Sequence, residues 1–139
     1  MKILRSTKSL AFALMLSLTA NLFAQGAKAE KVQIGQITTN SLYGLKSEYS
    51  SIVESTLFVV LQVKERYPEE DYDKLIDRLN DLAVEGNTPS IRYKAQLASL
   101  YFNYYDLFND IKITDKENPD KYFKLISERL SSKSTLAAN

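Results

Sequence analysis

The 139-residue chain has 18 basic and 17 acidic residues, a formal net charge of +1, and neither His nor Cys. These absences exclude a Ser-His-Asp triad, a thiolate nucleophile, imidazole or thiolate metal sites, and disulfide bonds. The hydrophobic core must therefore hold the fold together.

The amino terminus has the parts of a secretory signal peptide in the correct order. Basic residues precede an apolar stretch that begins at Leu10, and Ala27 and Ala29 form an A-x-A cleavage site. Polar residues interrupt the stretch before it reaches the 20 or so apolar residues that a membrane anchor needs. We therefore predict a cleaved signal peptide at residues 1–29, no stable membrane anchor, and a periplasmic or secreted protein that begins at Glu30.

Cleavage would remove four of the 18 basic residues and none of the 17 acidic ones, so the net charge would fall from +1 to −3. The remaining basic residues are scattered along the chain. A mildly acidic domain of this kind is not attracted to phosphate backbones or anionic lipid, so nucleic acid is not an expected partner.

The mature chain predicts a flexible leader and four helices. Residues 30–40 show only loosely spaced apolar side chains, and we expect them to form the leader. Beyond them, apolar residues recur at spacings of three and four, which is the helical period. The Ser- and Ala-rich tail at residues 132–139 is expected to fray. The predicted helices cover approximately residues 41–66, 69–85, 89–110 and 119–131.

Helix boundaries are marked by residues that cap or break helices. Pro68 ends the first helix and Gly86 ends the second. Thr88 is a predicted N-cap before Pro89, and Asn118 has the same place before the proline that starts the last helix.

The third predicted helix is apolar on almost every side. Its polar residues form one narrow stripe, and most of its other side chains are aliphatic or aromatic. A helix of this type must be packed on several sides, so we predict that it is the central helix of the domain. The fold class is then all-α, a single domain at residues 41–131 built as a small bundle of about four antiparallel helices, or as stacked helical hairpins.

One local sequence feature favours the stacked helical hairpins. The segment Asn87-Thr88-Pro89-Ser90-Ile91-Arg92, followed by Ala95, lies within a stretch that resembles a single HEAT-type helical hairpin. The resemblance covers residues 75–100, and no second copy is present. It implies local packing of two helices and no function.

Carboxylates are the remaining candidates for chemistry. Glu48 with Glu54, or Asp106 with Asp110, could supply the pair that a glycosidase uses, although solvated charges on helix faces explain them better. Acidic clusters at residues 69–73 and 115–120 lack the ligand pattern of a calcium-binding EF-hand loop and are typical of helix starts. We therefore predict no catalytic residues, no metal ligands and no cofactor.

Nine tyrosines make the chain rich in a residue that suits both core edges and protein interfaces. Most of them are expected to belong to the core. Any apolar surface left uncovered is predicted at Tyr101, Tyr104, Tyr105 and Phe108.

The preferred functional hypothesis is a small exported helical protein without catalytic activity. It would act by protein–protein contact, as a periplasmic partner, inhibitor, immunity protein or chaperone-like binder, and its partner would be another protein. The alternatives are a carboxylate-based hydrolase of cell-wall polysaccharide and a helical carrier of an apolar ligand.

Overall fold

The computed structural model describes residues 26–137. These residues divide into two units, with the boundary after Ile37. Residues 26–37 of the first unit are helical, and the expected cleavage site between Ala29 and Glu30 lies in this helical segment. Most of the expected signal peptide lies outside the described residues.

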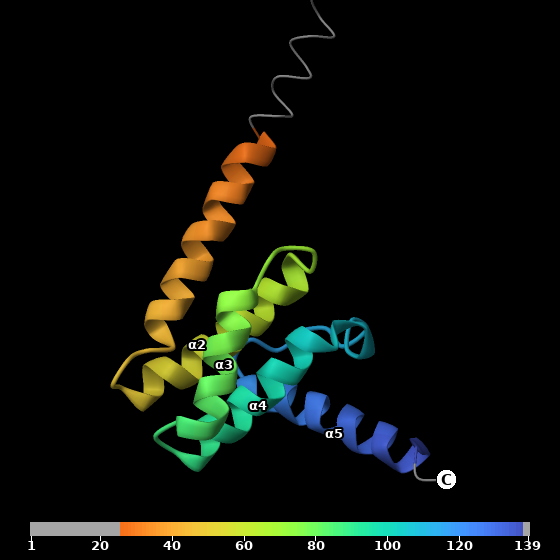
Figure 1. Ribbon diagram of the computed structural model, residues 1–139. Coiled ribbons are helices and arrows are strands. Elements are labelled where there is room, and N and C mark those ends of the chain that lie inside the picture. The colour runs from red at the N-terminus through yellow and green to blue at the C-terminus, as the bar shows by residue number, and fades with distance from the viewer. Residues whose placement is uncertain (1–25, 138–139) are drawn as a thin grey trace, which may run out of the picture. The chain divides into compact units, whose positions relative to one another are not determined.

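The second unit is helical from its first residues (Figure 1). Residues 38–44 are helical, and residues 26–137 contain no strand, which confirms the predicted all-α class. No helix in that range is long and apolar enough to span a bilayer. The elements that follow residue 44 are α2 (Ser50–Arg66), α3 (Asp73–Glu85), α4 (Pro89–Asn103), the 3-10 helix η1 (Tyr105–Leu107) and α5 (Pro119–Ala137).

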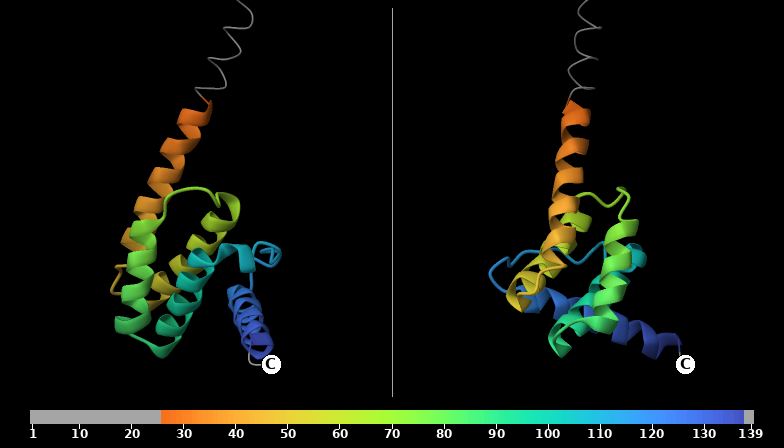
Figure 2. Two further views of the ribbon diagram at one scale, coloured as in Figure 1. Left: turned by 45° about the vertical axis from the view of Figure 1, so that its right-hand side comes forward. Right: turned by 60° about the vertical axis from the view of Figure 1, so that its left-hand side comes forward.

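Helix α4 lies at the centre of the second unit, as its apolar composition predicts. It packs against α2, α3, η1 and α5. Helices α3 and α4 run side by side in opposite directions (Figures 1 and 2). The largest fully buried side chains come from α2, α3, α4 and α5 and from the turns beside them: Leu45, Leu57, Val60, Leu61, Leu75, Leu79, Ile91, Tyr101, Phe108 and Ile126.

The α3–α4 hairpin forms as its boundary residues predict. The Thr88 hydroxyl accepts a hydrogen bond of 3.1 Å from the Ile91 backbone N–H, and Pro89 opens the helix. Gly86 ends α3 in a crowded position, where a Cβ would lie 2.6 Å from the Leu82 carbonyl oxygen. The residue type is therefore required by close packing at this turn.

The prediction of a leader without regular structure at residues 30–40 differs from the structure, in which these residues are helical. Ile34, Ile37, Ser41 and Leu45 are spaced by three, four and four residues, which is a helical period. Gly35, Thr38, Thr39 and Asn40 between them have low helix propensity and obscured this pattern.

The single helix predicted at residues 41–66 is also interrupted, because residues 45–49 form a turn. Gly44 lies so close to Thr56 that a Cβ would clash with that side chain, and Leu45 then turns fully into the core. The Arg78 guanidinium donates to the Leu45 carbonyl oxygen at 2.9 and 3.2 Å. This contact satisfies one of the carbonyls that the end of a helix leaves without a partner.

Helix α5 continues to Ala137, through the tail that was expected to fray. Serine hydroxyls in this segment donate to carbonyls one turn earlier, as Ser132 does to Arg129 at 2.8 Å and Ser134 to Ser131 at 2.9 Å. No proline or glycine interrupts the segment, so the helix has no breaker before its end.

Helix α4 ends earlier than predicted, at Asn103. The chain tightens into η1, where the Leu107 N–H donates to the Tyr104 carbonyl at 2.9 Å. This turn allows Phe108 to be buried completely. Packing of an aromatic side chain thus overrides the helical pattern that continues to residue 110 in the sequence.

Candidate functional site

A cluster of aromatic side chains lies where α4, η1 and α5 meet. Tyr101 is at its centre and is fully buried. Its ring centroid lies 5.4 Å from that of Tyr105, 5.6 Å from Phe108 and 6.0 Å from Tyr122. The Tyr105 and Tyr122 contacts have the edge-to-face geometry that aromatic pairs favour.

Two phenol hydroxyls are satisfied inside this cluster. The Tyr101 and Tyr122 hydroxyls share a hydrogen bond of 2.9 Å, and the Ile111 carbonyl oxygen lies 3.5 Å from the Tyr122 hydroxyl. Burial raises the pKa of Tyr122 to about 12 and raises the pKa of Tyr101 well above its ordinary value. The cluster is therefore a neutral, hydrogen-bonded part of the core at physiological pH.

The four residues predicted for a contact surface separate into two pairs. Tyr101 and Phe108 are fully buried, so the prediction that they contribute exposed surface is corrected. Their rings complete the core beneath the end of α4. Tyr104 is 56% exposed and Tyr105 is half-buried, so these two remain accessible.

An open groove of about 410 Å³ lies at the corner where α4 passes into η1. Tyr104 and Leu107 are exposed apolar residues on this groove, and Phe102 is its buried member. The remaining lining residues are Asn103, Tyr105 and Asp106. We call the six residues 102–107 the α4–η1 corner.

Lys64 of α2 fixes the aromatic rings behind this corner. Its ammonium nitrogen lies 5.2 Å from the ring centroids of both Tyr72 and Tyr105, which are cation–π distances. It also donates a hydrogen bond of 2.6 Å to the Pro68 carbonyl. Partial burial lowers the pKa of Lys64. Sequence analysis missed this residue because a lysine at a helix end normally indicates only a favourable contact with the helix dipole.

A second open groove, of about 490 Å³, runs between α4 and α5. Tyr93 crosses it by donating a hydrogen bond of 2.8 Å to the Ser127 hydroxyl. The Lys94 ammonium pairs with Asp120 at 2.8 Å and lies 5.6 Å from the Phe123 ring centroid. Most of the polar side chains of this groove are thus engaged with one another.

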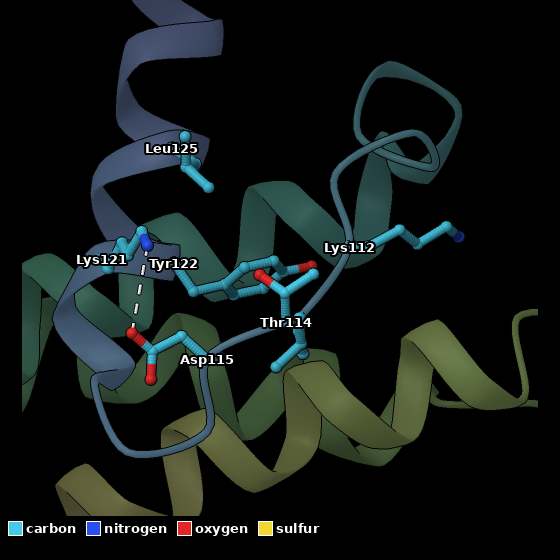
Figure 3. Close-up of a pocket in the computed structure, with 7 residues that line it drawn as sticks. Lys112, Thr114, Asp115, Lys121, Tyr122 and Leu125 are labelled. Atoms are coloured by element: carbon cyan, nitrogen blue, oxygen red, sulfur yellow. Dashed lines mark ion pairs between the residues drawn. The ribbon is translucent and has the colours of Figure 1, made fainter.

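The loop before α5 encloses a much smaller hollow of about 20 Å³ (Figure 3). The Tyr122 side chain extends from α5 toward Thr114, and Lys121 pairs with Asp115 at 3.9 Å. The hollow has room for about one water molecule, and is too small for an organic ligand.

Two of the four carboxylates considered for catalysis, Glu54 and Asp110, are paired with cations, and the other two, Glu48 and Asp106, are exposed. The Asp110 carboxylate makes two hydrogen bonds of 2.8 Å with Arg129, which lower its pKa. A glycosidase general acid needs the opposite shift. Glu54 lies 3.7 Å from the Lys94 ammonium. Residues 26–137 contain no group of three or more Asp or Glu side chains placed to hold a metal ion.

In comparisons with known proteins, no family model, curated protein sequence or solved structure matches the chain.

Proposed function

We propose that this chain is an exported helical protein that has no catalytic activity and acts by binding another protein through the α4–η1 corner. The observation that carries the proposal is the exposure of Tyr104 and Leu107 on an open groove directly above a rigid aromatic core. Tyrosine is enriched among the residues that contribute most to protein–protein affinity.

The packing beneath the corner supports this role. Asn103 is tied to α4, because its side-chain amide donates to the Ser99 carbonyl at 2.9 Å. On the other side of Tyr104, the Tyr105 ring packs against Tyr101 and lies near the Lys64 ammonium. A surface that is held in place before binding loses less conformational entropy when a partner docks.

The shape and chemistry of the corner suggest what the partner contributes. The corner is an open groove and not an enclosed pocket, which suits a protein surface better than a small ligand. The groove combines exposed apolar surface at Leu107 with the carboxylate of Asp106. A protein segment with an apolar anchor side chain beside a donor or a cation would complement it.

Affinity capture of the tagged protein from envelope and extracellular extracts of its host tests the binding role. We expect a stoichiometric partner that is retained by the original chain and lost with Tyr104→Ala, because truncation removes the exposed anchor. Tyr43→Ala is the matched control, since Tyr43 is 73% exposed and lies away from the corner in sequence. Equal recovery of the partner with both variants would rule out this binding surface.

The proposed export leads to a separate prediction about the N-terminus of the mature protein. The protein purified from the periplasm or culture medium should begin at Glu30, as measured by intact mass and N-terminal sequencing. Ala29→Lys places a large charged side chain at the cleavage site and should leave the precursor uncut. An original chain that keeps residues 1–29 and stays in the cytoplasm would contradict export.

A further inference from the structure

The solvent-facing side of α2 carries a regular stripe of residues. Helix α2 packs its buried side chains against α4, and the opposite face remains exposed. Ile52 is 45% exposed and Val59 is 40% exposed on this face. The stripe consists of Ile52, Ser55, Val59, Gln62 and Arg66, which are spaced by three, four, three and four residues. Residues at this spacing share one face of a helix, and two of the five, Ile52 and Val59, are apolar.

The hydroxyl groups along the stripe already have partners within the helix. Ser55 donates a hydrogen bond of 2.8 Å to the Ser51 carbonyl, and its neighbour Thr56 donates one of 2.7 Å to the Ile52 carbonyl. Burying these hydroxyls under another helix would therefore leave no hydroxyl donor unsatisfied. The face is suited to contact with another protein surface.

The charges on this side of the helix are placed at its two ends. Between residues 49 and 63 the one charged residue is Glu54, whose carboxylate is near the Lys94 ammonium. Glu48 lies just before α2 and Arg66 is its last residue, and both are exposed. Within residues 26–137 neither of these two makes an ion pair shorter than 4.0 Å with another residue.

We propose that α2 pairs antiparallel with α2 of a second copy of this chain, about a two-fold axis at the level of Leu57. In this arrangement Val59 faces the partner's Ser55, and the turn that carries Glu48 lies beside the end of the partner's α2 that carries Arg66. Val59 thus meets a small side chain, Ile52 faces the partner's Gln62, and opposite charges meet at each end. A parallel pairing would instead place Glu48 against the same carboxylate of the other copy. The interface lies on a different helix from the α4–η1 corner and does not depend on the proposed function.

Sedimentation equilibrium of the protein purified after expression of the full chain measures this association. We expect a concentration-dependent dimer. Glu48→Arg and Arg66→Glu should each weaken dimerisation at least about tenfold, and the double variant should restore it. A monomer at every concentration up to about 1 mM would overturn the proposal. So would two weakened single variants without recovery in the double variant.

Engineered cysteines test the antiparallel register independently, because the chain has no cysteine of its own. Under mild oxidation, a mixture of Ser55→Cys and Val59→Cys chains should form disulfide-linked dimers faster than either variant alone. Exposed Lys74→Cys on α3 is the matched control and should stay monomeric. Faster cross-linking of each variant with itself than with the other would overturn the antiparallel arrangement.

Discussion

Replacing Tyr101 with alanine is expected to lower the free energy of unfolding by about 3–5 kcal/mol, the usual cost of truncating a large buried aromatic side chain. Tyr101 has no exposed surface, and its ring packs against Tyr105, Phe108 and Tyr122. The substitution would also remove the hydrogen-bond partner of the buried Tyr122 hydroxyl. Urea denaturation followed by circular dichroism measures the change.

Tyr104→Ala provides a matched control only three residues away. Tyr104 is more than half exposed, so its truncation should change the free energy of unfolding by no more than about 0.5 kcal/mol. Comparable losses in the two variants would contradict the division of these tyrosines into a buried core residue and an exposed contact residue.

Raising the pH from 9 to 12 should destabilise the fold strongly and cooperatively. Burial raises the pKa of Tyr72 and of Tyr122 to about 12 and moves the pKa of Tyr101 in the same direction. In the unfolded chain these phenols ionise near pH 10, so above that pH the unfolded state binds fewer protons than the folded state. The stabilisation is fully present below pH 10 and is lost as the pH rises toward 12, by up to about 1.4 kcal/mol per pH unit for each tyrosine.

Urea denaturation at a series of pH values measures this loss. Tyr122→Phe should reduce the slope above pH 10 because it removes one of the three perturbed groups, although it also lowers the stability at neutral pH. Tyr43→Phe is the matched control at an exposed tyrosine. If all nine tyrosines ionised with a midpoint near pH 10 while the near-ultraviolet circular dichroism stayed constant, the buried cluster would be disproved.

Much of the fold could be predicted because its boundaries depend on local chemistry. Thr88 and Pro89 begin α4 through capping and backbone geometry, which a sequence shows directly. Gly86 was correctly predicted to end α3, although its role in the structure is close packing and not a left-handed cap. The central position of α4 was also predictable, since a helix with one narrow polar stripe must be covered on its other sides.

The breaks that sequence analysis missed depend on contacts between distant residues. The turn after Gly44 is stabilised by Arg78, 33 residues beyond Leu45, whose carbonyl it binds. The early end of α4 depends on the burial of Phe108. Periodicity alone identifies neither the Arg78 contact nor the burial of Phe108. It shows which residues share a face of one helix, and not which other residues cover that face.

The candidate site was predicted only in part for the same reason. Tyr101, Tyr105 and Phe108 occur at spacings of four and three, so the sequence indicates that they share a face. It does not show that α5 covers this face through Tyr122. Tyr104, three residues after Tyr101 and four before Phe108, fits a helical spacing equally well but is exposed, so only the fold distinguishes it from its neighbours.

Site-specific photocross-linking tests the central claim most directly. A benzophenone amino acid is placed at Tyr104 in one version of the protein and at Tyr43 in a second, and both are irradiated in the native host. We expect one discrete cross-linked protein from position 104 and none from position 43. Cross-links from position 43 alone, or the same products from both positions, would contradict a partner surface at the α4–η1 corner.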